Sequence, residues 1–201
     1  HYCGAPIVHA TLINADPKEI VITSCGTESN NTAIHSALVM NPGQRHVIIS
    51  AVEHSANINF GEFLQRRGFE VSCLPVETDG SIDIHLLDHS IRPDTAIVSI
   101  MWANNETGVL FPIDEIAAIC RSRGVPFHTD AVQVAGKIKI DVKATIGIDF
   151  LSLSGHKLHA PKGIGLLYVR RKTRFQPYII GGHQERGRRA EEQRQQEAAP
   201  T

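Results

Sequence analysis

The stretch LSLSGHKLHAPKGIG, residues 151–165, is the most informative part of this chain of 201 residues. A run of apolar and small residues stops at Gly155, and His156 and Lys157 follow directly. Such a run is typical of a strand that is buried on both faces of a sheet. A lysine at the end of such a strand is usually an exposed loop residue. The alternative is a partly desolvated amine that acts as a nucleophile.

The composition is that of a globular chain, with 42% hydrophobic and 20% charged residues, and its length suits one domain or a piece of a larger one. The formal net charge of −1 disfavours a general nucleic-acid or membrane-surface binder. No apolar run reaches the roughly 18 residues that span a bilayer. The cysteines and histidines show no metal-binding spacing. We therefore expect a cytoplasmic protein with no nucleic-acid, membrane or metal partner.

Short apolar runs alternate with longer amphipathic stretches along the chain, which predicts an α/β fold with a mostly parallel sheet. Pro112 and Gly124 suit the start and the end of one helix. We expect helices at about 28–40, 56–67, 84–90 and 113–123, and strands at 19–23, 46–50, 70–75, 95–103, 125–130, 148–154 and 163–169. In such sheets, ligands bind at the carboxyl ends of the strands, so the residues that follow each strand are the candidates for a site.

The first two strand ends carry residues that suit a ligand but that also have ordinary structural roles. Gly26 and Thr27 open a helix after the first strand, where free N–H groups can bind an anion. Thr27 could equally be a plain helix cap. His54 follows the second strand and could stack on a planar ring or transfer protons, or it could be a capping or surface histidine.

The fourth and fifth strand ends add an amide and a carboxylate. Asn104 and Asn105 leave the fourth strand together, so one could face a ligand and the other the turn, or both could belong to an Asn-rich turn. Asp130 closes the fifth strand, where a carboxylate needs a partner, and Gln133 follows it. A cationic ring nitrogen would serve as this partner, although Asp130 could also cap a helix.

The strand ends taken together favour a functional interpretation that no single residue supports alone. They supply an anion cradle, a histidine, an amide, a carboxylate and a lysine. This combination predicts a pyridoxal phosphate site in which Lys157 is the Schiff-base residue and Asp130 is the partner of the ring nitrogen.

The segments that carry this pattern resemble the cysteine desulfurases of the class V aminotransferase group, and most closely the NifS type. They are TSCGTESNNTAI, VEHSA, MWANNETG, FHTDAVQ, SLSGHKLHAPKG and GGHQERGRRA, and the resemblance covers about residues 16–190. It implies the large domain of a fold-type I pyridoxal-phosphate enzyme, which is a three-layer α/β sandwich with a mostly parallel sheet. It also implies a homodimer in the full-length family.

The resemblance implies which residues bind the phosphate of the cofactor. Gly26 and Thr27 would contact it through the helix start, and Ser154 and His156 would add hydrogen bonds. Gly155, between them, is expected among the cofactor-binding residues.

The resemblance likewise implies which residues hold the ring and act in catalysis. Asn105 and Gln133 would bond the region of the ring hydroxyl, and Asp130 would hold the ring nitrogen. His54 would stack on the ring and move protons. Lys157, which binds the cofactor covalently, and His54 are the two expected catalytic residues.

The family reaction converts L-cysteine to L-alanine and passes the sulfur to an enzyme persulfide, which feeds an iron–sulfur scaffold protein. The domain that carries the persulfide cysteine in the family has no counterpart in this sequence. We therefore expect residues 1–190 to be a large domain that is incomplete at both ends, residues 191–201 to be a polar tail foreign to the family, and the chain to bind cofactor weakly with little turnover.

Two other functions stay open at this point. One is selenocysteine lyase or another class V aminotransferase activity, because the cofactor motifs do not separate these substrates. The other is a non-catalytic fragment that binds the cofactor or a partner. An α/β-hydrolase is disfavoured because the sequence lacks a G-x-S-x-G motif.

Overall fold

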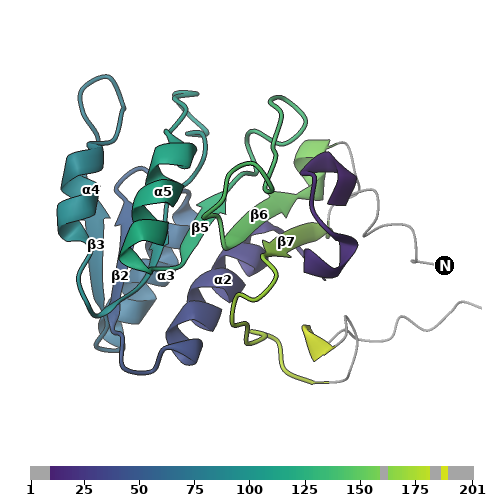
Figure 1. The fold of residues 1–201 in the computed structure, drawn as a ribbon, viewed down its shortest axis with the longest axis horizontal. Helices are drawn as coiled ribbons and strands as arrows, with labels where there is room; N and C mark the ends of the chain where they lie inside the picture. Colours follow the sequence, from purple (N-terminus) through teal and green to yellow (C-terminus); the bar gives the residue numbers. More distant parts are fainter. Residues whose placement is uncertain (1–9, 159–162, 182–186, 190–201) are drawn as a thin grey trace, which may run out of the picture.

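The computed structural model describes residues 10–158, 163–181 and 187–189, and its centre is a seven-stranded sheet (Figure 1). The strand order is β1-β7-β6-β5-β4-β2-β3. The strands are β1 (Ile20–Thr23), β2 (His46–Ser50), β3 (Glu70–Leu74), β4 (Thr95–Ser99), β5 (Phe127–Asp130), β6 (Phe150–Ser154) and β7 (Gly165–Val169). Strand β7 runs antiparallel to both of its neighbours, and the other strands are mutually parallel. The mostly parallel sheet is therefore confirmed.

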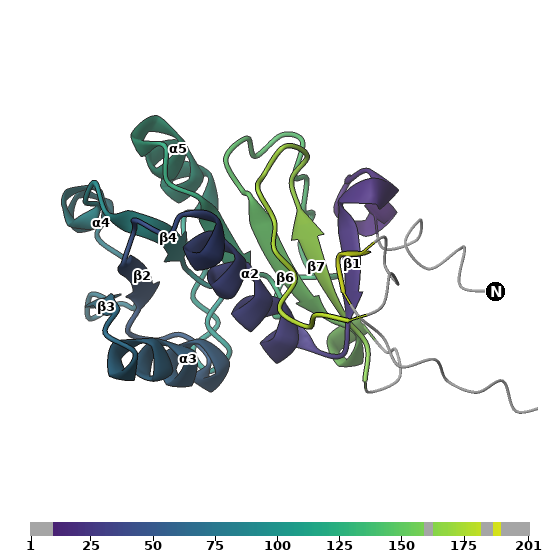
Figure 2. The same ribbon diagram turned by 90° about the horizontal axis from the view of Figure 1, so that it is seen from below.

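Helices cover both faces of this sheet, as the two views show (Figures 1 and 2). They are α2 (Gly26–Met40), α3 (Ser55–Arg66), α4 (Ile84–Ser90) and α5 (Ile113–Arg123), with short 3₁₀ helices η1 (Pro17–Glu19) and η2 (Gly155–Leu158). Helices α2 and α3 pack on one face, and α4 and α5 pack on the other. The predicted three-layer α/β fold is confirmed, as is each of the predicted helices and strands.

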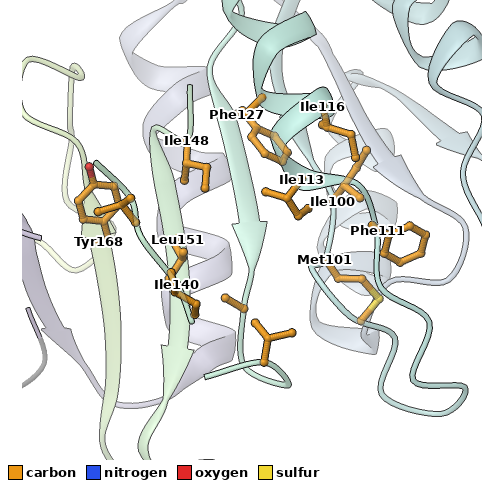
Figure 3. Close-up of a cluster of buried hydrophobic side chains, with 14 of the residues drawn as sticks. Ile100, Met101, Phe111, Ile113, Ile116, Phe127, Ile140, Ile148, Leu151 and Tyr168 are labelled. Atoms are coloured by element: carbon orange, nitrogen blue, oxygen red, sulfur yellow. The ribbon is translucent and has the colours of Figure 1, made fainter. Parts of the chain in front are cut away.

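The apolar strands are buried because their alternate residues enter two separate cores. Ile49 and Phe150 face α2 and α3, whereas Ile48 and Leu151 face the side of α5. Figure 3 shows part of the second core, in which Phe127 of β5 lies beside Ile113 and Ile116 of α5. Two buried faces explain why the strands read as continuous apolar runs instead of alternating ones.

Several element boundaries differ from the sequence prediction, and two of these differences have a clear structural reason. The predicted strand 95–103 ends at Ser99 because the chain there separates from β2, although Ile100 and Trp102 still donate hydrogen bonds to β5. Helix α2 starts at Gly26, two residues earlier than expected, so Thr27 lies inside its first turn. The N-cap is Cys25, which makes no side-chain cap bond, and the capping role of Thr27 is not observed.

Two further expectations concern the ends of the chain and membranes. The predicted polar tail, residues 191–201, lies outside the described residues. Within the described part of the chain, the helices are too short or too polar to cross a lipid bilayer.

Gly165, at the start of β7, allows the sheet to pack against the turn that leads into α2. A Cβ atom at this position would lie 2.5 Å from the carbonyl carbon of Cys25 and 2.6 Å from Oγ1 of Thr23. Both neighbours belong to the segment that places the start of α2. Only glycine therefore fits here without displacing that segment.

We expect Gly165→Ala to lower the free energy of unfolding by about 1–3 kcal/mol, because a methyl group forced against backbone atoms must shift one of the two segments. Urea unfolding of the cofactor-free chain measures this change. Gly43→Ala is the control, since a Cβ atom at Gly43 would meet no atom within 4 Å. Equal stability of the two variants would contradict the close approach.

Candidate functional site

A cavity of about 320 Å³ lies where the carboxyl ends of five strands meet. It is lined by residues that follow β1, β2, β4, β5 and β6, namely Cys25, Gly26, Thr27, Asn30, His54, Met101, Asn105, Asp130, Val132, Gln133, Ser154, His156 and Lys157. Every predicted site residue except Gly155 is in this set. Gly155 is buried, and its N–H donates to the carbonyl of Ile164, 2.8 Å away.

The start of α2 forms one end of the cavity. The first hydrogen bond of the helix runs from the N–H of Ser29 to the carbonyl of Cys25, so the N–H groups of residues 26–28 precede it. A Cβ atom on Gly26 would lie 3.1 Å from Cγ2 of Val132, which shows how closely the helix start approaches the segment after β5. This helix start is suited to bind an anion.

The strand end that carries the lysine lies beside this helix start. Oγ of Ser154 and Nδ1 of His156 are 2.8 Å apart, so the two side chains form one polar unit. Lys157 follows on η2, lines the cavity and is exposed to solvent. The expected desolvation of the Lys157 amine is therefore not observed. What distinguishes Lys157 from an ordinary loop lysine is its position among the other residues that line the cavity.

Asp130 is a buried carboxyl group whose two oxygens are each held by a neighbour. Oδ2 accepts a hydrogen bond from Nδ2 of Asn30 at 2.7 Å, and Oδ1 accepts one from the N–H of Val132 at 3.0 Å. Burial raises the pKa of Asp130, although these hydrogen bonds and the nearby His54 act to lower it. Asp130 forms no salt bridge with any residue of the described segments. A cation in the cavity would compensate this carboxylate.

His54 caps a helix and also lies at the cavity, and its role toward a ring or a proton stays a prediction. Its Nδ1 accepts a hydrogen bond from the N–H of Ala56 at 3.1 Å, so it caps α3, and it also lines the cavity. The two adjacent asparagines point in different directions, which is the first of the two alternatives that the sequence left open. Asn104 turns back, and its Oδ1 accepts hydrogen bonds from the N–H groups of Glu106 and Thr107, whereas Asn105 lines the cavity.

Two other polar residues near the site, His128 and Asn30, were not among the candidates from the sequence. His128 does not line the cavity; it is buried between Ser99 and Ser152, and burial lowers its pKa to about 3. Asn30, which the sequence analysis missed, lines the cavity and holds Asp130. Its spacing of four residues from Gly26 places both residues on one helix face, and this signal could have revealed it.

Glu53 was also missed, and it lies behind the cavity lining. It is buried, with 7% of its surface exposed, and it accepts hydrogen bonds from Ser50, Asn57 and the backbone of Met101. Burial raises the pKa of Glu53 to about 7 despite these hydrogen bonds, and the charge of Asp130 adds to the rise.

The sequence of this chain is similar to those of a known protein family. The sequence model of the family "Aminotransferase class-V" matches residues 8–201. Cysteine desulfurase 2 of Trichormus variabilis is 54% identical over 181 residues, which are 90% of this chain and 45% of that protein. Cysteine desulfurase NifS of Azotobacter vinelandii is 54% identical over 172 residues, which are 86% of this chain and 42% of that protein. The chain thus spans less than half the length of these curated relatives.

Solved structures agree with the sequence comparison. A structure described as a NifS-like protein superposes with a TM-score of 0.89 at 35% identity, covering 94% of this chain and 53% of that one. A structure of SspA in complex with cysteine gives a TM-score of 0.88 at 42% identity, covering 93% of this chain and 55% of that one.

Proposed function

Because this chain belongs to the class V aminotransferase family, we propose that it carries the cofactor site of a cysteine desulfurase. In this proposal the chain binds pyridoxal phosphate in the cavity at the carboxyl ends of the strands. Its substrate is L-cysteine, which is converted to L-alanine while the sulfur passes to an enzyme persulfide. An iron–sulfur scaffold protein is the proposed sulfur acceptor, and the proposed assembly is the homodimer that the family resemblance implies.

The residues present fit this cofactor in three separate respects. A phosphate suits the N–H groups at the start of α2, next to Ser154. A protonated ring nitrogen suits the carboxylate of Asp130, and an aldehyde suits the amine of Lys157. The volume of about 320 Å³ lies within the range of small-molecule sites.

The observation that carries the proposal is the placement of Asp130. A carboxylate that is buried, held through both oxygens and without a salt bridge among the described residues is costly unless a cation joins it. It lines the same cavity as a free helix start and Lys157. A simple phosphate ligand would explain the helix start but not the carboxylate.

When bound, the cofactor supplies an electron sink for negative charge at the substrate α-carbon. The side chains of this chain supply the remaining steps. Asp130 would keep the proton on the ring nitrogen, and the amine of Lys157 would take up the α-proton of the substrate. His54 would lie against the ring and move protons, while Asn105 and Gln133 would orient the ring through hydrogen bonds.

Selenocysteine lyase or another class V activity is the alternative, since the same cavity residues would serve these substrates. The similarity to the structure of SspA in complex with cysteine favours cysteine. A cofactor-binding chain without catalysis is the other alternative.

We expect the 201-residue chain alone to turn over slowly. Cys120 is buried, and burial raises its pKa to about 12, so it is not a thiolate at neutral pH. Cys73 lies on β3 and does not line the cavity, and Cys25 lies at the helix start proposed for the phosphate. Among the cysteines of the described segments, Cys73 and Cys120 are therefore not suited to take sulfur from the substrate, and Cys25 lines only the proposed phosphate end of the cavity.

Adding L-cysteine to the cofactor-loaded chain tests the proposal. We expect the absorbance spectrum of the bound cofactor to change, while sulfide and L-alanine form far more slowly than with a full-length relative under the same conditions. L-serine, which lacks the sulfur, and the Lys157→Ala variant are the controls. An unchanged spectrum would contradict the assigned substrate, and turnover at the rate of the full-length relative would contradict the expected low activity.

A further inference from the structure

We propose that Glu53 is a positioning residue that fixes His54 and the end of β4 around the cofactor cavity. This inference rests on the proposed function, because it assigns a role toward the same cofactor. Glu53 does not line the cavity, so it acts through residues that do.

The carboxyl group of Glu53 joins three elements of the fold. Its Oε1 accepts hydrogen bonds from Oγ of Ser50, at the end of β2, and from the N–H of Met101, beyond the end of β4, both at 2.7 Å. Its Oε2 accepts a hydrogen bond from Nδ2 of Asn57, in the first turn of α3, at 2.9 Å. Met101 lines the cavity, so one buried side chain connects the cavity wall to two neighbouring elements.

The hydrogen bond from Met101 to Glu53 replaces the backbone hydrogen bond that β2 would accept if it continued beside this segment. Strand β2 ends at Ser50, whereas the chain after β4 continues beside β5 through the N–H groups of Ile100 and Trp102. Because alternate residues of a strand point their N–H groups to opposite sides, the N–H of Met101 faces the side that β2 has left. Glu53 accepts this N–H, which would otherwise be buried without a partner.

The hydrogen bond between Glu53 and Asn57 links the two segments that flank His54. Glu53 and Asn57 lie on either side of His54 in the sequence, and the N–H of Asn57 also donates to the carbonyl of His54 at 2.8 Å. The ring of His54 is held in turn by the N–H of Ala56. The backbone and the ring of His54 are thus fixed from both sides, which sets the direction from which the ring meets a bound cofactor.

A conservative variant can separate the geometry of Glu53 from its charge. In Glu53→Gln the amide oxygen can still accept from Ser50 and Met101. The new amide nitrogen needs an acceptor, and Oδ1 of Asn57 is buried without a hydrogen-bond partner in the described structure. Rotation of the Asn57 amide by half a turn would supply it. Glu53→Ala, in contrast, leaves Asn57 and the N–H of Met101 unpaired.

Titration of the full chain with pyridoxal phosphate, followed by absorbance, tests the inference. We expect Glu53→Ala to raise the dissociation constant about tenfold or more, and Glu53→Gln to stay within about threefold of wild type. Glu19→Ala is the matched control. Glu19 also accepts two backbone N–H groups, from Asp16 and Arg171, but it does not line the cofactor cavity. This control should lose stability while keeping its affinity for the cofactor.

Hydrogen exchange of the cofactor-free proteins supplies a second measurement that does not depend on cofactor binding. Faster exchange of the Met101 and Asn57 amides in Glu53→Ala, restored in Glu53→Gln, would support the inference. Equal affinities of Glu53→Ala and Glu19→Ala, or unchanged exchange at Met101, would overturn it. If the wild-type chain binds no pyridoxal phosphate, the proposed function fails, and the exchange data alone decide whether Glu53 holds these elements.

Discussion

Replacing Lys157 with alanine is expected to abolish the covalent retention of pyridoxal phosphate by this chain. Lys157 is the only lysine among the cavity-lining residues of the described structure, so no other amine there can replace it. It directly follows His156, which forms a polar pair with Ser154 beside the proposed phosphate end of the cavity. A cofactor anchored by its phosphate would therefore bring its aldehyde within reach of this lysine.

The measurement is the cofactor absorbance that remains after incubation with pyridoxal phosphate and removal of the unbound ligand. We expect wild type to retain cofactor and Lys157→Ala to retain none beyond the background. Lys137→Ala is the matched control, because Lys137 is an exposed lysine that does not line the cavity. Retention of cofactor by Lys157→Ala at the wild-type level would contradict the assignment.

Replacing Asp130 with asparagine is expected to weaken cofactor binding about 100-fold, because the variant removes the negative charge proposed to face the ring nitrogen while leaving that cation buried. The cofactor-free protein should be no less stable than wild type. A buried carboxylate is costly without a cation, as the raised pKa of Asp130 indicates. Asn30 can re-pair with the new amide by rotating its own amide, since its Oδ1 has no partner in the described structure.

Cofactor titration and urea unfolding of the same variant check both parts of this prediction. Asp149→Asn is the control, since burial also raises the pKa of Asp149, which accepts hydrogen bonds from Phe127 and Thr173 away from the cavity. That control should keep its cofactor affinity. A loss of stability in Asp130→Asn without weaker cofactor binding would show that Asp130 is a structural residue.

The sequence predicted the helices and strands of this fold closely because the sheet is buried on both faces. Each strand is then a short apolar run with a turn on either side, such as β2 and β6. The reversed direction of β7 was not predicted. The connection from Ser154 to Gly165 is short, however, and parallel neighbours need a crossover of a dozen residues or more. The length of the connection between β6 and β7 would therefore have predicted the antiparallel direction of β7, which the apolar pattern does not specify.

The candidate site was predictable because its residues follow the strands directly. Asp130 and Lys157 come from neighbouring strand ends, and the parallel sheet brings such ends together. Glu53 could not be found in this way. Its hydrogen bond to Met101 joins residues 48 positions apart, and it exists only because β2 and β4 are neighbours. The apolar pattern carries no information about this strand order.

Reduction of the cofactor-loaded chain with borohydride, followed by peptide mapping with mass spectrometry, tests the central claim most directly. Reduction fixes a pyridoxyl group on the amine that holds the cofactor. We predict one labelled peptide, in which the pyridoxyl group is on Lys157. A label on another lysine, or no label on the loaded wild-type chain, would contradict the assignment of this cavity as a pyridoxal phosphate site.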